Sequence, residues 1–96
     1  MFEIELSGAG EVIVRGRLDA AQAEKAEAFL DEIEGAFVVD LSGLEYISSA
    51  GLGVLLKTHI RLVSAGNVLK LVQVNSHIND ILKYSGFDKL FDIEAG

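Results

Sequence analysis

The stretch VVDLSGLEYISSAGLGVL, residues 38–55, decides the fold of this chain. It begins within a largely apolar run at residues 36–41, which is typical of a strand that is covered on both faces. After a connection at residues 42–47, Ser48 and Ser49 stand where a helical pattern begins. The sequence therefore predicts a buried strand that leads, through a pair of serines, into a helix.

Strand and helix patterns alternate on both sides of this stretch. Residues 2–6 alternate apolar and acidic side chains, and they pair with residues 12–18 across a turn that contains glycine. Further strands are expected at residues 68–74 and 90–93, and helices at residues 20–34, 48–64 and 76–85. This order predicts one α/β domain over residues 1–96, with a small mixed, mostly parallel sheet, an N-terminal antiparallel hairpin and three helices. Because the helices are few, one face of the sheet is expected to be better covered than the other.

Composition and charge exclude several classes of function. The 96 residues are 50% hydrophobic, which suits one compact core. The formal net charge is -7, so we expect no binding to nucleic acid, whose phosphates would repel the chain. There is no cysteine, and no apolar stretch of the ~20 residues that a membrane span requires. Residues 1–10 lack the basic start and the long apolar run of a secretory leader, so none is expected. We expect a soluble cytoplasmic protein with no direct membrane insertion and no cofactor.

The helix that follows the serine pair offers a place for an anion. The first N–H groups of a helix have no acceptor within it, and the helix dipole favours negative charge there. Gly51 and Gly53 leave room for a close approach by an anion or by another backbone. Ser48 or Ser49 can cap the helix when unmodified and present phosphate oxygens when modified. A serine before a helix is most often only a cap, so the residues alone leave both interpretations open.

The same helix also suggests a docking surface. Its inward stripe is predicted to consist of Leu52, Leu55, Leu56, His59 and Val63. Val54 and Leu62 fall off this stripe, beside Thr58 and Arg61, so part of the outer face is expected to be apolar. With the serine pair, this face is the predicted partner-binding surface.

Three segments of the chain resemble one family, in the family's order. The run from Asp40 to Gly53 resembles the central motif of anti-sigma factor antagonists of the STAS family. In that motif an aspartate-leucine-serine strand end leads to an aspartate-serine-serine/threonine-glycine-leucine helix start. Residues 16–19, GRLD, are similar to the family's glycine-glutamate-leucine-aspartate signature, and residues 86–91, GFDKLF, look like its C-terminal segment. Since the matches span nearly the whole chain, the resemblance implies a STAS fold.

The resemblance also implies a phosphorylation site. In the family, a partner kinase phosphorylates the first serine after the aspartate, and this serine matches Ser49. Ser48 stands where the aspartate usually stands, which removes a carboxylate and makes Ser48 a rival acceptor. Ala50 stands in place of the second hydroxyl.

The implied function is partner switching. An unmodified antagonist binds an anti-sigma factor that is also a serine kinase, which frees a sigma factor. The kinase then uses ATP to phosphorylate the antagonist and lets it go, and a PP2C-type phosphatase resets it. The residues expected to contact the partner are Asp19, Ser48, Ser49, Ala50, Gly51, Gly53, Val54, Thr58 and Arg61.

Two other interpretations share this fold. A STAS accessory subunit of a transport or signalling complex, such as the soluble component of a lipid-transport complex, would dock by the same helix face without phosphorylation switching. The other is a general interaction module of a signalling assembly. These interpretations stay open because a fold does not determine a function.

Catalysis and metal binding are not expected. Ser49 lacks the preceding glycine of a nucleophile elbow, and the chain has no phosphate-binding loop and no convincing base partner. His59 and His77 are isolated, and His59 on the inner stripe is predicted to be a core residue with its polar atoms satisfied. The sequence therefore predicts no catalytic residue and no metal site.

Overall fold

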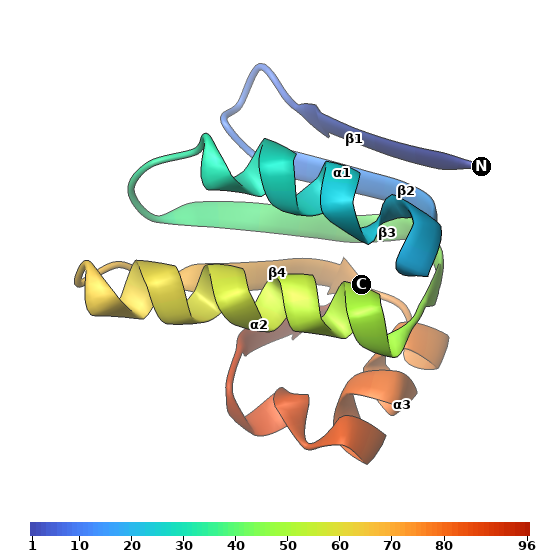
Figure 1. Ribbon diagram of the computed structural model, residues 1–96. Helices are drawn as coiled ribbons and strands as arrows, with labels where there is room; N and C mark the ends of the chain where they lie inside the picture. The colour runs from blue at the N-terminus through green and yellow to red at the C-terminus, as the bar shows by residue number, and fades with distance from the viewer.

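The computed structural model describes residues 1–96 and contains one five-stranded sheet (Figure 1). The strands lie in chain order: β1 (Phe2–Leu6), β2 (Val12–Leu18), β3 (Phe37–Ile47), β4 (Leu69–Val74) and β5 (Asp92–Ala95). β1 pairs with β2 in antiparallel fashion, and every other neighbouring pair is parallel. The predicted hairpin and mostly parallel sheet are confirmed.

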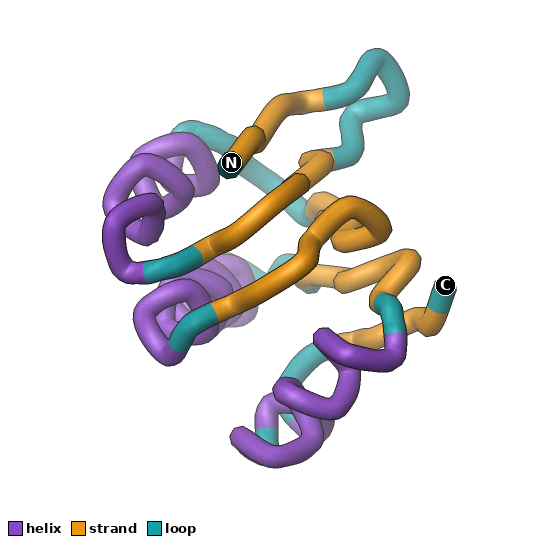
Figure 2. The backbone as a smooth tube through the Cα atoms, turned by 90° about the vertical axis from the view of Figure 1, so that its right-hand side faces the viewer, coloured by secondary structure: helices purple, strands orange, loops and turns teal.

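The helices cover the two sides of the sheet unequally. They are α1 (Ala20–Asp31), α2 (Ser49–Ser64) and α3 (Ser76–Ser85), with a short 3-10 helix, η1 (Phe87–Lys89), after α3. Figure 2 shows α1 and α2 together on one side of the sheet, while the opposite side of β1 and β2 carries no helix. The third helix, α3, contacts β3. The predicted inequality of the two faces is confirmed. None of the helices combines the length and the apolar content needed to cross a lipid bilayer.

The strand β3 is longer than the sequence suggested. Residues 42–47 were expected to be a connection, but they continue the strand and pair with β2. Two register shifts between β2 and β3 mark bulges, and a bulge changes which face the next side chain points to. The bulged strand thereby returns Leu44 and Ile47 to the core, where both are buried.

The predicted boundaries of α1 and β5 differ from the structure by a few residues. α1 ends at Asp31 rather than at residue 34, and Gly35, with a left-handed backbone, follows only after a short bend. β5 spans Asp92–Ala95 rather than residues 90–93, because η1 and the turn at Leu90 and Phe91 that follows it precede the strand. These helices and strands otherwise lie where the patterns placed them.

The prediction for the inward face of α2 was wrong in part. Leu52 and Leu55 are buried as expected, but Val63 is 54% exposed, and Leu56 and His59 are only partly buried. The buried positions instead include Val54, Thr58 and Leu62. The physical reason is that α2 packs against α1 as well as against the sheet, so its buried arc is turned toward α1.

Candidate functional site

The ends of β2 and β3 bring two helix starts together. Leu18 pairs with Ile47, and these are the last residues of the two parallel strands. The Ser48 N–H donates to the Leu18 carbonyl oxygen at 2.9 Å, which fixes the two chain exits side by side. Asp19 and Ser48, the residues that follow, are the N-caps of α1 and α2. One edge of the sheet therefore carries both sequence-predicted motifs.

The two serines have different environments. The hydroxyl of Ser48 accepts a hydrogen bond from the Gly51 N–H at 3.2 Å, and its carbonyl oxygen accepts from the Leu52 N–H at 2.9 Å. Ser48 is half-buried, whereas Ser49 is exposed and its hydroxyl makes no hydrogen bond within the protein. Ser48 is therefore the cap, and Ser49 is the serine whose oxygen is free.

The start of α2 has the properties of an anion site. The N–H groups of Ser49 and Ala50 donate to no acceptor in the protein, and both residues are exposed. The helix dipole adds to the preference of these groups for negative charge. On the neighbouring helix, the Asp19 carboxylate accepts from the Gln22 N–H at 3.2 Å, so this acidic group is held close to the same edge as a cap. A phosphate on Ser49 would find free amides on its own helix.

The two glycines of α2, Gly51 and Gly53, differ in whether the fold leaves room for a side chain. A Cβ on Gly51 would lie 2.8 Å from the Leu18 side chain and carbonyl oxygen and 2.8 Å from the Ile47 side chain, so only glycine fits where α2 crosses the strand ends. A Cβ on Gly53 would meet no atom within 4 Å. Glycine inside a helix costs about 1 kcal/mol relative to alanine. The fold requires Gly51 but not Gly53.

The exposed side of α2 carries a line of small and apolar residues that begins at Ser49. Residues spaced alternately by four and three share one face of a helix. By this spacing one face of α2 contains Ser49, Gly53, Leu56, Ile60 and Val63, which we call the outer strip. Ile60 and Val63 are each 54% exposed. An apolar surface thus exists on α2, but on a different face from the one that the sequence predicted.

Residues predicted to form the docking face instead hold α2 against its neighbours. Val54 and Leu62 are almost fully buried, and the buried Thr58 hydroxyl donates to the Val54 carbonyl oxygen at 2.9 Å. Arg61 Nη2 donates to the Leu30 carbonyl oxygen in α1 at 2.8 Å, and its Nε lies 3.9 Å from an Asp31 carboxylate oxygen. The side chains of Val54 and Thr58 do not reach the surface, so they lie inside the domain rather than on the predicted docking face.

His59 packs against the C-terminal segment. Its ring lies edge-on to Phe91, with the ring centroids 5.1 Å apart, and Phe91 is in turn edge-on to Phe87. The buried Nδ1 atom of His59 has no hydrogen-bond partner, so the prediction of a satisfied histidine was wrong. No group of three or more histidine, cysteine and acidic side chains is arranged to hold a metal ion.

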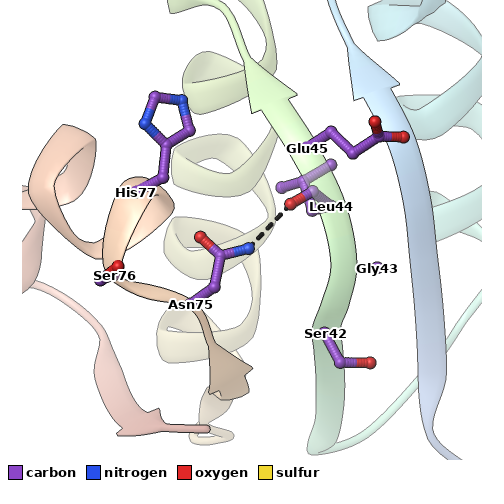
Figure 3. Close-up of a pocket in the computed structure, with 7 residues that line it drawn as sticks. All are labelled: Ser42, Gly43, Leu44, Glu45, Asn75, Ser76 and His77. Carbon is purple, nitrogen blue, oxygen red and sulfur yellow. Dashed lines mark hydrogen bonds between the residues drawn. The ribbon is translucent and has the colours of Figure 1, made fainter.

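A groove that no sequence pattern indicated lies beside β3 and the start of α3 (Figure 3). The groove encloses about 610 Å³ and is lined by Ser42, Gly43, Leu44, Glu45, Asn75, Ser76 and His77. Asn75 Nδ2 donates to the Leu44 carbonyl oxygen at 2.9 Å, which fastens α3 to the strand. Figure 3 shows Ser42 and Glu45 pointing toward β2, away from His77. Because these polar side chains diverge, they do not form a binding constellation.

Comparisons with known proteins identify the family of the chain. A family model described as "Mlab, STAS domain" matches residues 3–92. A Bordetella bronchiseptica protein that is named as an anti-sigma factor antagonist, BtrV, is 36% identical over 84 residues, which cover 83% of this chain and 72% of that protein.

Solved structures share the fold. A Thermotoga maritima protein named as an anti-sigma factor antagonist matches with a TM-score of 0.81 and 22% identity, over 100% of this chain and 87% of that one. The phosphorylated form of SpoIIAA, a Bacillus cell fate determinant, matches with a TM-score of 0.71 and 18% identity, over 100% of this chain and 92% of that one.

Proposed function

Because the chain belongs to the STAS domain family of anti-sigma factor antagonists, we propose that it binds an anti-sigma factor that is also a serine kinase, and that phosphorylation of Ser49 ends this binding. A PP2C-type phosphatase would restore the unmodified form. All three proteins would act in the cytoplasm. The domain is then the substrate of the kinase rather than a catalyst.

The observation that carries the proposal is the difference between the two serine hydroxyls. Ser48 already uses its oxygen to cap α2, and it is half-buried. Ser49 is exposed at the first position of the helix, with no hydrogen bond that the kinase must break. In the transfer, Ser49 Oγ bonds to the γ-phosphorus of ATP, the bond from that phosphorus to the bridging oxygen of ADP breaks, and a base on the kinase takes the hydroxyl proton.

The charge of the phosphate explains the release. A phosphoserine adds a charge of about -1.5 to -2. The part of α2 next to Ser49 carries no charge, because Ala50 follows it and the outer strip continues with Gly53 and apolar residues. A partner that fits this surface would have to desolvate the new charge, and the nearby Asp19 carboxylate gives it no compensation. The free amides at the start of α2 let the modified domain itself stay folded.

The test uses variants of both serines. Purified protein is incubated with ATP and cell extract, and phosphate is located by mass spectrometry of the peptide that spans residues 48–57. Phosphate is expected on Ser49, and also on Ser49 of a Ser48→Ala variant, which serves as the control. Ser49→Ala is expected to stay bound to the kinase in the presence of ATP, and Ser49→Asp to bind weakly. Equal binding of these two variants contradicts the switch.

A second candidate is an accessory subunit of a transport or signalling complex. One observation favours it: the residues on both sides of Ser49 differ from the family's phosphorylation motif. The residue before it is Ser48, a neutral cap rather than a carboxylate, and the residue after it is Ala50, which has no hydroxyl. Such a subunit would dock through the same edge without modification. Absence of phosphate from both serines in the same experiment supports this candidate over the first.

A further inference from the structure

We propose that Gly53 is the point at which the main chain of the serine kinase comes closest to α2, so that a side chain at this position holds the kinase away from Ser49. The inference rests on the function proposed above. It assigns the outer strip as the surface on which the kinase lies, and it gives a functional reason for a glycine that the fold does not require.

The free protein has no structural need for glycine at position 53. A Cβ there would occupy open space, and the backbone at this residue is not left-handed. At Gly51, two residues earlier, the same Cβ would collide with Leu18 and Ile47. Glycine weakens a helix interior relative to alanine, and at position 53 no contact within the protein offsets this. A contact outside the chain would account for this glycine.

The position of Gly53 fits an approach to Ser49. The two residues are four apart in α2, so they lie one above the other on the same face, about 6 Å apart along the axis. A kinase has to place the γ-phosphate of ATP in line with Ser49 Oγ. Any protein that covers Ser49 from this face also covers Gly53. Because Gly53 has no side chain, that protein can approach closer to the helix axis at this position.

The rest of the outer strip identifies the kinase as the occupant. Beyond Gly53 the strip continues with the half-buried Leu56 and with Ile60 and Val63, each 54% exposed. A protein that buries these apolar side chains and also reaches Ser49 must lie along the outer strip. Gly53 then lies between the apolar side chains that this protein covers and the serine at its active site. The protein that must reach Ser49 is the kinase that modifies it.

The test compares bulk at position 53 with bulk elsewhere on the helix. The variants are Gly53→Ala, Gly53→Leu and the control Ser64→Leu, which adds an exposed side chain about 22 Å along the helix from Ser49. Each is incubated with ATP and cell extract, and the rate of phosphate appearance on Ser49 is followed by mass spectrometry. Thermal unfolding is measured in parallel.

The expected results separate stability from recognition. Gly53→Ala is expected to raise Tm by about 4–8 °C, because alanine favours the helix. It is also expected to slow Ser49 phosphorylation by about tenfold, since overpacking of a tight contact has a cost of this order. Gly53→Leu should slow phosphorylation further, and Ser64→Leu should leave the rate unchanged.

Three results would overturn the inference, and they differ in what else they affect. If wild-type protein is phosphorylated and both Gly53 variants are phosphorylated at the same rate, the inference is wrong and the proposed function stands. If Gly53→Ala lowers Tm, the fold itself needs the glycine. If wild-type Ser49 receives no phosphate, the proposed function is wrong and the inference falls with it.

Discussion

The inner and outer faces of α2 are both apolar, but they have different neighbours. On the inner face, Val54 and Leu62 are almost fully buried between α2, α1 and the sheet. On the outer face, Ile60 and Val63 are more than half exposed, in line with Ser49. The difference shows that apolar spacing identifies a face of a helix without saying what covers it. In this domain the position of α1 decides which apolar face is core and which is free for a partner.

The largest expected effect comes from truncating adjacent residues on the two faces. Leu62→Ala removes a side chain that is 1% exposed, so we expect the free energy of unfolding to fall by about 2–5 kcal/mol. Val63→Ala is the matched control, and a change within about 0.5 kcal/mol is expected because the side chain is 54% exposed. Equilibrium urea unfolding measures both. Similar losses for the two variants would show that α2 is rotated relative to the structure described above.

An intermediate effect is expected from the two serines. Ser48→Ala removes the hydroxyl that caps the Gly51 N–H, and the loss of such a cap lowers the free energy of unfolding by about 0.5–2 kcal/mol. Ser49→Ala should change stability by less than about 0.5 kcal/mol, since its hydroxyl makes no hydrogen bond. Thermal and urea unfolding of both variants test this. The assignment of cap and acceptor would have to be exchanged if Ser49→Ala were the more destabilising change.

The sequence predicted most of the fold because local patterns determine it. The hairpin and the alternation of strands and helices follow from interactions between residues close in the chain. The edge that carries the candidate site could also be predicted, because parallel strands end at the same edge of a sheet.

Contacts between distant residues explain what the sequence did not predict. The rotation of α2 depends on α1, for example through the hydrogen bond from Arg61 to the Leu30 carbonyl oxygen, and the pattern of α2 alone contains no trace of that partner. The bulges of β3 depend in the same way on its register with β2. The assignment of the free hydroxyl to Ser49 required the geometry of the cap, since the sequence alone allows either serine to form it.

The smallest expected effect concerns an ion pair between α1 and α2. Lys57 on α2 forms an ion pair with Glu27 on α1, and the hydrogen bond to this carboxylate raises the pKa of Lys57 above its usual value of 10.5. A raised pKa in the folded state means that the protonated lysine stabilises the fold. The contribution is complete below pH 10.5 and is lost as the pH rises through the folded-state pKa.

Lys57→Met should therefore reduce the decline in Tm between neutral pH and pH 11. The reduction is expected to be small because both side chains are partly solvated. Parallel Tm profiles for wild type and variant would show that this pair does not couple α2 to α1, and that the buried face of α2 alone sets the rotation of the helix.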